Sequence, residues 1–275
     1  MSDLPRPQKI VATGWIRSME KGETGGSQPH LFQTEAGQYM VKVKNNPQGA
    51  RVLANELVGG LCLDWLGVKH PQSAVVDIPQ DVIDDNPGAR FKGGLPLVSG
   101  EAFGSEYWQS DPKEAVDPKL ICNREDVART LAYDTWVRQH DGRQYRVRSS
   151  KSNVGKYEFI PVDQGHSLGN PNWSESGLEE KIESVAAPEP VISLNFDDFK
   201  EVIERLRSFS MSDAEHIVAQ VPESWLRATE RQALSDIYLN EQRRLQKFLK
   251  VSIRPQEVHN DAVPILSDSI RSGCG

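Results

Sequence analysis

Long apolar runs are absent from this sequence, and cysteine is scarce. No stretch approaches the roughly 18 to 20 consecutive apolar residues that a membrane helix requires. The polar segment from Met1 to Lys9 is followed by no long apolar run, so we expect no secretory signal. The three cysteines, Cys62, Cys122 and Cys274, are scattered and form no C-x-x-C motif. They indicate neither a disulfide framework nor a zinc site, and they are typical of a protein of the reducing cytoplasm.

An excess of positive charge is also missing. The chain of 275 residues has 32 Lys and Arg against 39 Asp and Glu, a net charge of −7. This balance disfavours a general binder of nucleic acid or of anionic membranes. The segment from Trp225 to Val251 is rich in basic residues, but Glu230, Asp236 and Glu241 interrupt it, which is more typical of a solvated helix face. The hydrophobic content of 37% is too high for a disordered chain.

The first part of the chain has the pattern of a β-rich unit that contains one helix. The segment from Lys9 to Met19 holds a short apolar run. We expect strands at His30 to Thr34, Tyr39 to Lys44 and Ala74 to Ile78, and one near the end of Leu95 to Trp108. An apolar residue recurs at every fourth position in Leu53, Leu57, Leu61 and Trp65, which predicts a helix that begins near Ala50 and ends at Gly67. Pro79 to Gly94 is expected to be irregular.

The second part is predicted to be mostly helical. Asn123 is expected to cap a helix of about 16 residues, and a hairpin of two short strands, Tyr145 to Arg148 and Lys156 to Val162, should follow. Helices are then predicted for Phe199 to Phe209, Asp213 to Gln220 with Ser212 as the cap, and Trp225 to Val251. The tail from Ser252 has no clear pattern.

This order predicts an α+β protein of two unlike lobes, with the irregular segment from Tyr107 to Asn123 as the joint. We assign residues 1–110 to an N-terminal lobe and residues 111–275 to a helical C-terminal lobe. A cleft between two such lobes is a usual place for a small ligand.

Two charged residues of the first lobe suggest chemistry. Lys42 lies in the middle of a predicted strand, on the same face as Met40, where a plain solvated lysine is the simpler interpretation. Glu56, 14 residues later, borders the apolar stripe of the predicted helix and therefore needs a cationic partner. A strand lysine that pairs with a glutamate of the next helix is the arrangement by which protein kinases hold nucleotide phosphates.

Three loops add to this interpretation. The segment around Gly25, Gly26 and Ser27 lacks Walker or G-x-G-x-x-G spacing, so it fits an ordinary turn as well as a phosphate-binding loop. Asp141 follows a long helix and Asp163 follows an apolar strand, and a hairpin separates them. Each could be a turn or strand-end residue, but two carboxylates at the mouth of a cleft can also divide the work of a base and of a Mg²⁺ ligand.

Taken together, five segments between Ser18 and Leu168 resemble the HipA-like kinases, bacterial proteins with a protein-kinase-like fold. The segments are Gly25-Gly26-Ser27-Gln28-Pro29, Tyr39-Met40-Val41-Lys42, Asn55-Glu56-Leu57, Asp134-Thr135-Trp136-Val137 leading to Asp141, and Val162-Asp163-Gln164-Gly165-His166. The Asp-x-Gly-His phrase and the Asp-Thr-Trp-Val helix end are fairly specific to that family.

The resemblance implies a protein-kinase-like fold and a role for each matching residue. Lys42 would contact the α- and β-phosphates of ATP and Glu56 would orient it. Asp141 would be the catalytic-loop aspartate and Asp163 the Mg²⁺ ligand. The loop at Gly25, Gly26 and Ser27 would cover the phosphates, and the adenine would stack near Gly104 to Tyr107.

The catalytic loop departs from the family pattern. The position of the amide that holds a second metal is occupied by Arg146, and an arginine cannot ligate Mg²⁺. The nearest amide, Gln144, is offset by two residues. Either Gln144 substitutes as a ligand, or one metal suffices, or phosphoryl transfer is impaired.

Two functions therefore stay open at the level of sequence. The first is an ATP- and Mg²⁺-dependent kinase that phosphorylates Ser or Thr of a protein, or of itself, in a toxin–antitoxin or other regulatory setting. The second is a catalytically impaired kinase-like module that binds nucleotide or a partner protein.

Overall fold

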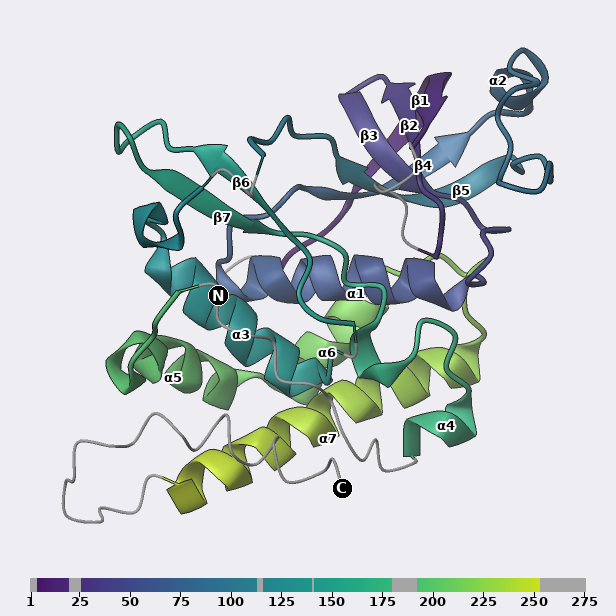
Figure 1. The fold of residues 1–275 in the computed structure, drawn as a ribbon. Coiled ribbons are helices and arrows are strands. Elements are labelled where there is room, and N and C mark those ends of the chain that lie inside the picture. Colours follow the sequence, from purple (N-terminus) through teal and green to yellow (C-terminus); the bar gives the residue numbers. More distant parts are fainter. Residues whose placement is uncertain (1–3, 20–25, 113–115, 140, 180–191, 253–275) are drawn as a thin grey trace, which may run out of the picture.

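A computed structural model of the chain describes residues 4–19, 26–112, 116–139, 141–179 and 192–252, and it is a mixed α+β structure (Figure 1). A β-barrel stands at one end of the molecule, and most of the helices lie below it in this view. The helix α1, Arg51–Leu66, runs between the two parts.

The N-terminal strands close into a barrel in the order β1-β2-β3-β5-β4. The strands are β1 Gln8–Ser18, β2 His30–Thr34, β3 Gly37–Lys42, β4 Ser73–Ile78 and β5 Gly100–Glu106. Only the β1–β4 pair in this closed barrel is parallel. Alternation along the strands sends Phe32, Val41 and Val76 into a barrel core of their own. The strands predicted from the sequence are confirmed, although β3 ends at Lys42 and not at Lys44, and the apolar run from Lys9 proves to be part of β1.

The helix α1 is buried around almost its whole circumference. Thirteen of its 16 residues are buried, so it lacks the single apolar stripe of a surface helix. It packs on β4 and β5 on one side and on helices of the second part on the other. Gly67 ends the helix in the left-handed conformation with φ 73°, as its position after the last periodic residue predicted.

Two glycines in the middle of α1 allow these close contacts. A Cβ atom at Gly59 would lie 2.5 Å from both Tyr133 Oη and Gln164 Cβ, and one at Gly60 would lie 2.1 Å from Ser73 Oγ. Glycine has a low helix propensity, but at these two positions it allows tight packing on both sides of α1.

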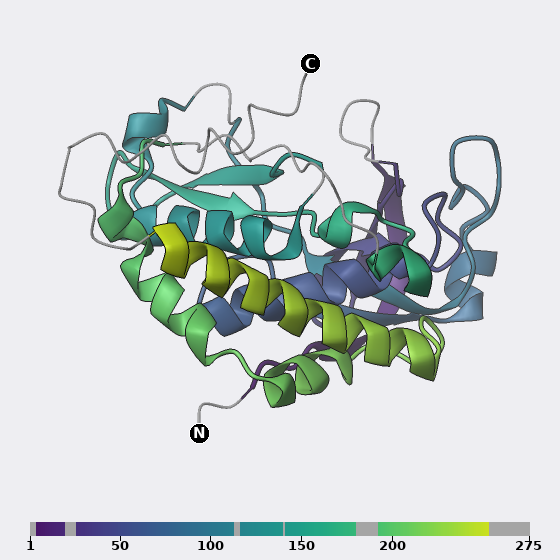
Figure 2. The ribbon, with the colours of Figure 1, turned by 90° about the horizontal axis from the view of Figure 1, so that it is seen from below.

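The second part consists mainly of helices around one large aromatic cluster. Trp136 is fully buried, its ring packs edge-on against Tyr133, Phe209 and Tyr238, and its indole N–H donates to the carbonyl of Tyr238. The helices are α3 Arg124–Val137, α4 Glu175–Glu179, α5 Lys200–Ser208, α6 Met211–Val218 and α7 Ala228–Ser252, with short 3₁₀ turns at Pro118–Leu120, Ser167–Gly169 and Phe196–Phe199. Figure 2 shows α7 crossing the underside of the molecule.

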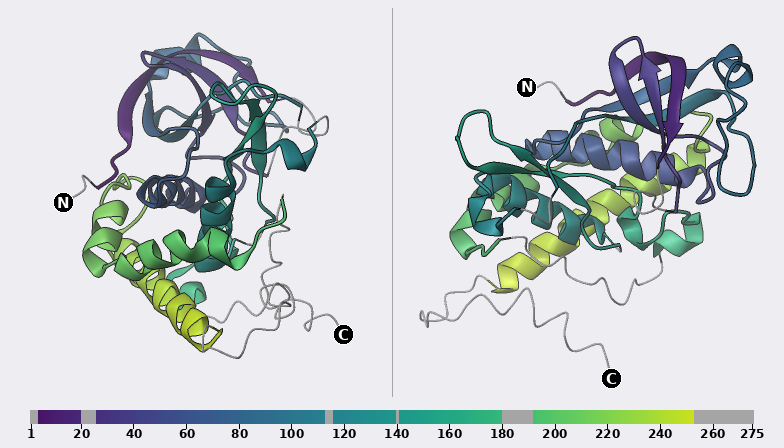
Figure 3. Two further views of the ribbon diagram at one scale, coloured as in Figure 1. Left: turned by 90° about the vertical axis from the view of Figure 1, so that its left-hand side faces the viewer. Right: turned by 45° about the horizontal axis from the view of Figure 1, so that its top comes forward.

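A separate hairpin follows the predicted catalytic loop. Its strands are β6 Tyr145–Ser149 and β7 Tyr157–Pro161, and they pair antiparallel as predicted. Figure 3 shows this hairpin beside the barrel and above α3. The segment that leaves the barrel joins the hairpin through Asp111, whose carboxylate accepts from both the N–H and the hydroxyl of Ser149.

Several local expectations were wrong. The segment from Pro79 to Gly94 contains a helix, α2 Gln80–Asp84. The cap of α6 is Ser210 and not Ser212, because Ser210 and Asp213 exchange a reciprocal pair of hydrogen bonds. Asn123 is the N-cap residue of α3 as predicted, but its side chain makes no capping hydrogen bond and binds the backbone of Phe159 instead. The tail beyond Ser252 lies outside the described residues.

Candidate active site

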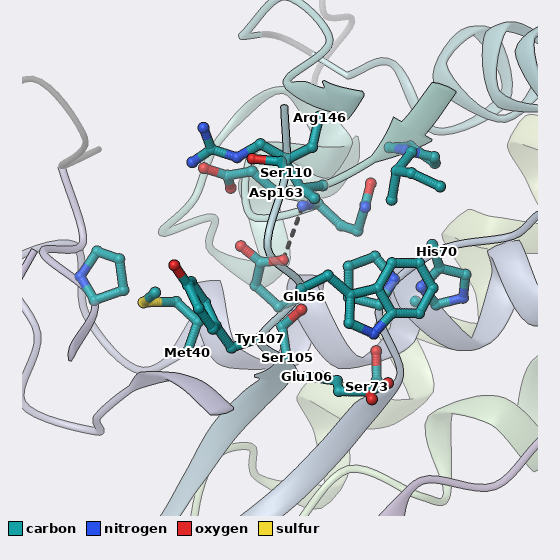
Figure 4. Close-up of a pocket in the computed structure, with 18 of the residues that line it drawn as sticks. Met40, Glu56, His70, Ser73, Ser105, Glu106, Tyr107, Ser110, Arg146 and Asp163 are labelled. Carbon is teal, nitrogen blue, oxygen red and sulfur yellow. Dashed lines mark hydrogen bonds between the residues drawn. The ribbon is translucent and has the colours of Figure 1, made fainter. Parts of the chain in front are cut away.

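A cleft lies between the barrel, α1 and the β6–β7 hairpin. Residues from all three units line it, together with the segment Tyr107 to Ser110 that connects the barrel to the second part. Figure 4 shows the side chains that converge there, with Glu56 and Asp163 near the centre. The cleft is therefore lined in part by the first residues of the segment that was expected to join the two lobes.

Lys42 lies in this cleft between two carboxylates. Its ammonium group forms an ion pair with Glu56 and a second one with Asp163, whose Oδ1 lies 3.1 Å from Lys42 Nζ. Lys42 is 7% exposed and Glu56 is 3% exposed. Lys42 is the last residue of β3, Glu56 lies in the middle of α1, and Asp163 follows β7, so three separate elements supply the three charges.

The electrostatics of the triad follow from burial and from these contacts. Burial by itself would lower the pKa of Lys42, but Asp163 and Glu56 outweigh it and raise that pKa. Burial also opposes ionisation of Asp163, but Lys42 and the hydrogen bonds to the carboxylate hold its pKa well below the usual range. Burial raises the pKa of Glu56 despite the neighbouring Lys42. Lys42 is thus a cation and Asp163 an anion at neutral pH.

Asp163 has a strained backbone that is fixed from several sides. Its φ of 61° lies in the left-handed region, which is uncommon for a residue with a side chain. Its carbonyl accepts hydrogen bonds from Gln139 Nε2 at 3.3 Å and from Arg143 Nη1 at 3.4 Å. Its Oδ1 accepts from Gly165 N at 3.3 Å. The surrounding contacts therefore hold the carboxylate in one orientation.

Arg143 connects the predicted catalytic loop to the Asp163 loop. It forms a buried ion pair with Asp134 of α3, and its Nη1 also donates to Val162 O at 2.9 Å and to Gln164 Oε1 at 2.7 Å. Burial raises the pKa of Asp134 although Arg143 opposes this effect. Arg143 was not among the site residues predicted from the sequence. The sequence signal that could have indicated its role is its position nine residues after Asp134, an acidic residue near the end of a predicted apolar helix.

Gly165 and Asn55 shape the loop after Asp163. A Cβ atom at Gly165 would lie 2.7 Å from Val52 Cγ2 and 3.0 Å from Glu56 Oε1, so a larger residue would collide with α1. Asn55 Nδ2 donates to Gly165 O at 2.8 Å, and its Oδ1 accepts from Trp173 Nε1. Glu56 Oε2 accepts from the N–H of Gln164 at 2.8 Å. The adjacent pair Asn55 and Glu56 thus binds the loop to α1, which explains two buried polar residues in an apolar helix.

The predicted phosphate loop is described only in part. Gly25 lies outside the described residues. Gly26 packs against Gln48, whose Nε2 would lie 2.7 Å from a Cβ atom there, and Ser27 is buried at the edge of the cleft. Gln48 Nε2 in turn lies 3.1 Å from His166 Nε2, so Gln48 lies between Gly26 and the segment that follows Asp163.

The remaining predicted residues lie at or beyond the margin of the cleft. Asp141 and Gln144 are exposed, and neither is among the residues that line it. The Asp141 and Asp163 loops are nonetheless adjacent, because Gln139 Nε2 reaches Asp141 O at 3.5 Å as well as Asp163 O. Arg146 lines the cleft.

The predicted adenine region contributes three residues to the cleft. Ser105, Glu106 and Tyr107 line it, as does Trp108, whose ring carries the Arg148 guanidinium 4.4 Å from its centroid. Gly104 instead lies inside the barrel, where a Cβ atom would be 2.4 Å from Val76 Cγ2.

Neither a dense metal cluster nor a membrane span occurs in the described part of the chain. No group of three or more His, Cys, Asp or Glu side chains there could hold a metal ion. No helix among the described residues is long and apolar enough to cross a membrane. A hard cation such as Mg²⁺ does not need such a cluster, because it is commonly held by one or two carboxylates and by substrate phosphates.

Comparison with known proteins assigns the chain to a family. A family profile described as HipA-like kinase matches residues 16–251. The crystal structure of a Helicobacter pylori proinflammatory kinase, CtkA, superimposes with a TM-score of 0.55 at 10% sequence identity, and the match covers 91% of this chain and 99% of that one. At this identity the likeness shows a shared kinase fold alone. No curated protein matches the sequence. The family match spans most of the chain, which therefore belongs to the HipA-like kinase family.

Proposed function

We propose that this protein is an ATP- and Mg²⁺-dependent kinase that transfers the γ-phosphoryl group to a Ser or Thr hydroxyl of a protein, or of its own chain. The observation that carries the proposal is the contact between Lys42 and Asp163, which brings together residues 121 positions apart beside Glu56. A buried lysine held between two carboxylates at the wall of a cleft is suited to bind an anionic ligand together with a cation.

The donor set of the site fits a single Mg²⁺ ion. Asp163 is ionised, and its Oδ1 is engaged by Lys42 and Gly165. The carboxylate of Asp163, which also contacts the Glu56 side chain, is the group that would hold the metal. Bound Mg²⁺ would neutralise charge on the triphosphate. Gln144, outside the cleft lining, is the weaker of the two predicted metal ligands.

The other residues bind and position the reactants. Lys42, oriented by Glu56, binds phosphate oxygens, and Gly25, Gly26 and Ser27 cover them. Asp141 accepts the proton of the attacking hydroxyl while the new P–O bond forms and the bond from the γ-phosphorus to ADP breaks. Asp141 is exposed, which leaves room for a protein substrate to bring its hydroxyl to it.

We further propose that residues 1–110 and 111–275 act as two lobes around the nucleotide, with Ser105, Glu106 and Tyr107 beside the adenine. A cytoplasmic toxin–antitoxin or other regulatory setting fits the family and the scattered cysteines.

Incubation of the pure protein with radiolabelled ATP and Mg²⁺ tests the proposal. We expect label on the protein or on an added protein substrate, and none with Asp163→Ala or Asp141→Ala. Lys42→Met should weaken nucleotide binding as well as transfer. A wild-type signal that Asp163→Ala does not diminish would argue against the proposal.

Binding without transfer is the second candidate function. It is favoured by Arg146, which lines the cleft where related kinases have a metal-binding amide, and by the exposed position of Gln144. A rise in Tm with ATP and Mg²⁺ but no labelled product would select this candidate.

A further inference from the structure

The cations of the cleft differ in how they are neutralised. Lys42 contacts two carboxylates. Arg148 lies over the ring of Trp108, and its Nη2 is 3.4 Å from Glu158 Oε2. Arg146 lines the same cleft, but within the described ranges no hydrogen bond, ion pair or aromatic ring engages its guanidinium.

The strand β6 explains why Arg146 has no partner inside the protein. Val147 points to the buried side of the hairpin, so its neighbour Arg146 points to the opposite, exposed side. Arg146 pairs in register with Ile160, three residues before Asp163, which places it on the strand beside the one that leads to the Asp163 loop. In Figure 4 the side chain of Arg146 lies on the same side of the cleft as Asp163 and Ser110.

The balance of charges in the cleft indicates which ligand Arg146 would bind. Lys42 faces Glu56 and Asp163 at once, so these three residues together offer little positive charge to a polyanion. A guanidinium is always charged and presents several donors in a planar fork that matches phosphate oxygens. An unpaired arginine in a cleft with this charge deficit is the remaining cation that can meet a phosphate chain.

We infer that Arg146 binds the phosphate chain of the nucleotide and supplies positive charge there in addition to one metal ion and Lys42. The inference rests on the proposed function, because it concerns the same cleft and the same ligand. It also gives Arg146 a function in the cleft at a position where it cannot serve as a metal ligand.

Isothermal titration calorimetry with AMP, ADP and a non-hydrolysable ATP analogue, at fixed Mg²⁺, tests the inference. For Arg146→Gln we expect the affinity for the ATP analogue to fall about tenfold, that for ADP to fall less, and that for AMP to stay as in the wild type. Arg146→Lys keeps the charge but loses the planar fork of donors. Its affinity for the ATP analogue should lie between those of the wild type and Arg146→Gln. Because the residue is exposed, the Tm of each variant without ligand should match the wild type.

Lys151→Gln is the matched control, since it removes one positive charge from the exposed turn of the same hairpin outside the cleft lining. It should leave all three affinities unchanged. Equal losses for AMP and the ATP analogue, or no loss with Arg146→Gln, would overturn the inference while the proposed function stands. If the wild type binds none of the nucleotides, the proposed function fails and this inference fails with it.

Discussion

Arg143 positions the Asp163 loop through contacts with parts of the chain that are distant in sequence. Arg143 pairs with Asp134 nine residues earlier and also holds the carbonyls of Val162 and Asp163. The pair is removed from water, so each charge depends on the other. The orientation of the Asp163 carboxylate is thus a consequence of a buried ion pair outside the cleft.

Removal of one member of this pair should be costly. We expect Arg143→Met to lower the free energy of unfolding by about 3–5 kcal/mol, because it leaves Asp134 buried without a counter-charge. The double variant Asp134→Leu/Arg143→Met should lose less than Arg143→Met alone. Urea denaturation measures both. Equal losses in the single and double variants would show that the two charges are not coupled.

At the scale of elements, α1 is the part on which the site depends. It carries Asn55 and Glu56, contacts the barrel and the helices, and is anchored at its first turn by Arg51, which pairs with Glu230 of α7. The glycines in its middle allow its neighbours to approach closely. Because neighbouring elements cover this helix on both sides, packing fixes the position of Glu56 beside Lys42.

A glycine of α1 tests this packing. Alanine is the better helix former by about 1 kcal/mol, so Gly59→Ala would stabilise an isolated helix. In the protein its Cβ would collide with Tyr133 and Gln164, and we expect a net destabilisation of about 1–3 kcal/mol. Gly14→Ala is the control, because nothing lies within 4 Å of its Cβ position. Stabilisation by Gly59→Ala in thermal unfolding would contradict the packing described here.

The contact between α1 and α7 should depend on pH. Burial opposes ionisation of Glu230, but hydrogen bonds from Arg227 and Arg51 outweigh it and lower its pKa from 4.5 to about 2. A depressed carboxyl pKa stabilises the folded state above the unfolded value and loses that contribution as the pH falls towards the folded value. We expect up to about 3 kcal/mol to be lost between pH 4.5 and 2.

Urea denaturation at several pH values measures this loss, and Glu230→Gln should flatten the dependence over that interval. Glu204→Gln is the control, since the Glu204 side chain is 70% exposed and its ion pair is on the surface. An unchanged pH dependence in Glu230→Gln would assign the acid sensitivity to other groups.

At the scale of the whole molecule, two apolar cores meet at α1. The barrel has its own core, and α1 belongs to the larger core that includes α3, α5, α6 and α7. Val75 of β4 and Phe103 of β5 also join the larger core, so the barrel is bound to it directly. The cleft therefore lies between the barrel and the helical part, both of which pack against α1.

This arrangement predicts cooperative unfolding. We expect one calorimetric transition for the intact chain and a loss of about 2–5 kcal/mol with Leu57→Ala, a fully buried residue of α1, without separation into two transitions. Two resolved transitions in the wild type would show that the barrel and the helical part unfold independently.

The sequence by itself determined the strands, the main helices, the order of the two parts and the family resemblance. These features depend on periodicity, on turn residues such as Gly67 and on short motifs, which act over a few positions. Even so, Ser212 was predicted as the cap in place of Ser210. Each serine has an acidic residue three positions later, Asp213 or Glu215, and only the backbone geometry distinguishes them.

The tertiary structure decided the parts that need distant residues to meet. It placed Lys42 3.1 Å from Asp163, 121 positions away, and it brought Gln164 to Glu56 across 108 positions. It also gave Arg143 and Asn55 their contacts with the Asp163 loop, and it left Arg146 exposed in the cleft. No local pattern specifies such contacts, because they arise from the packing of α1 between the barrel and the helices.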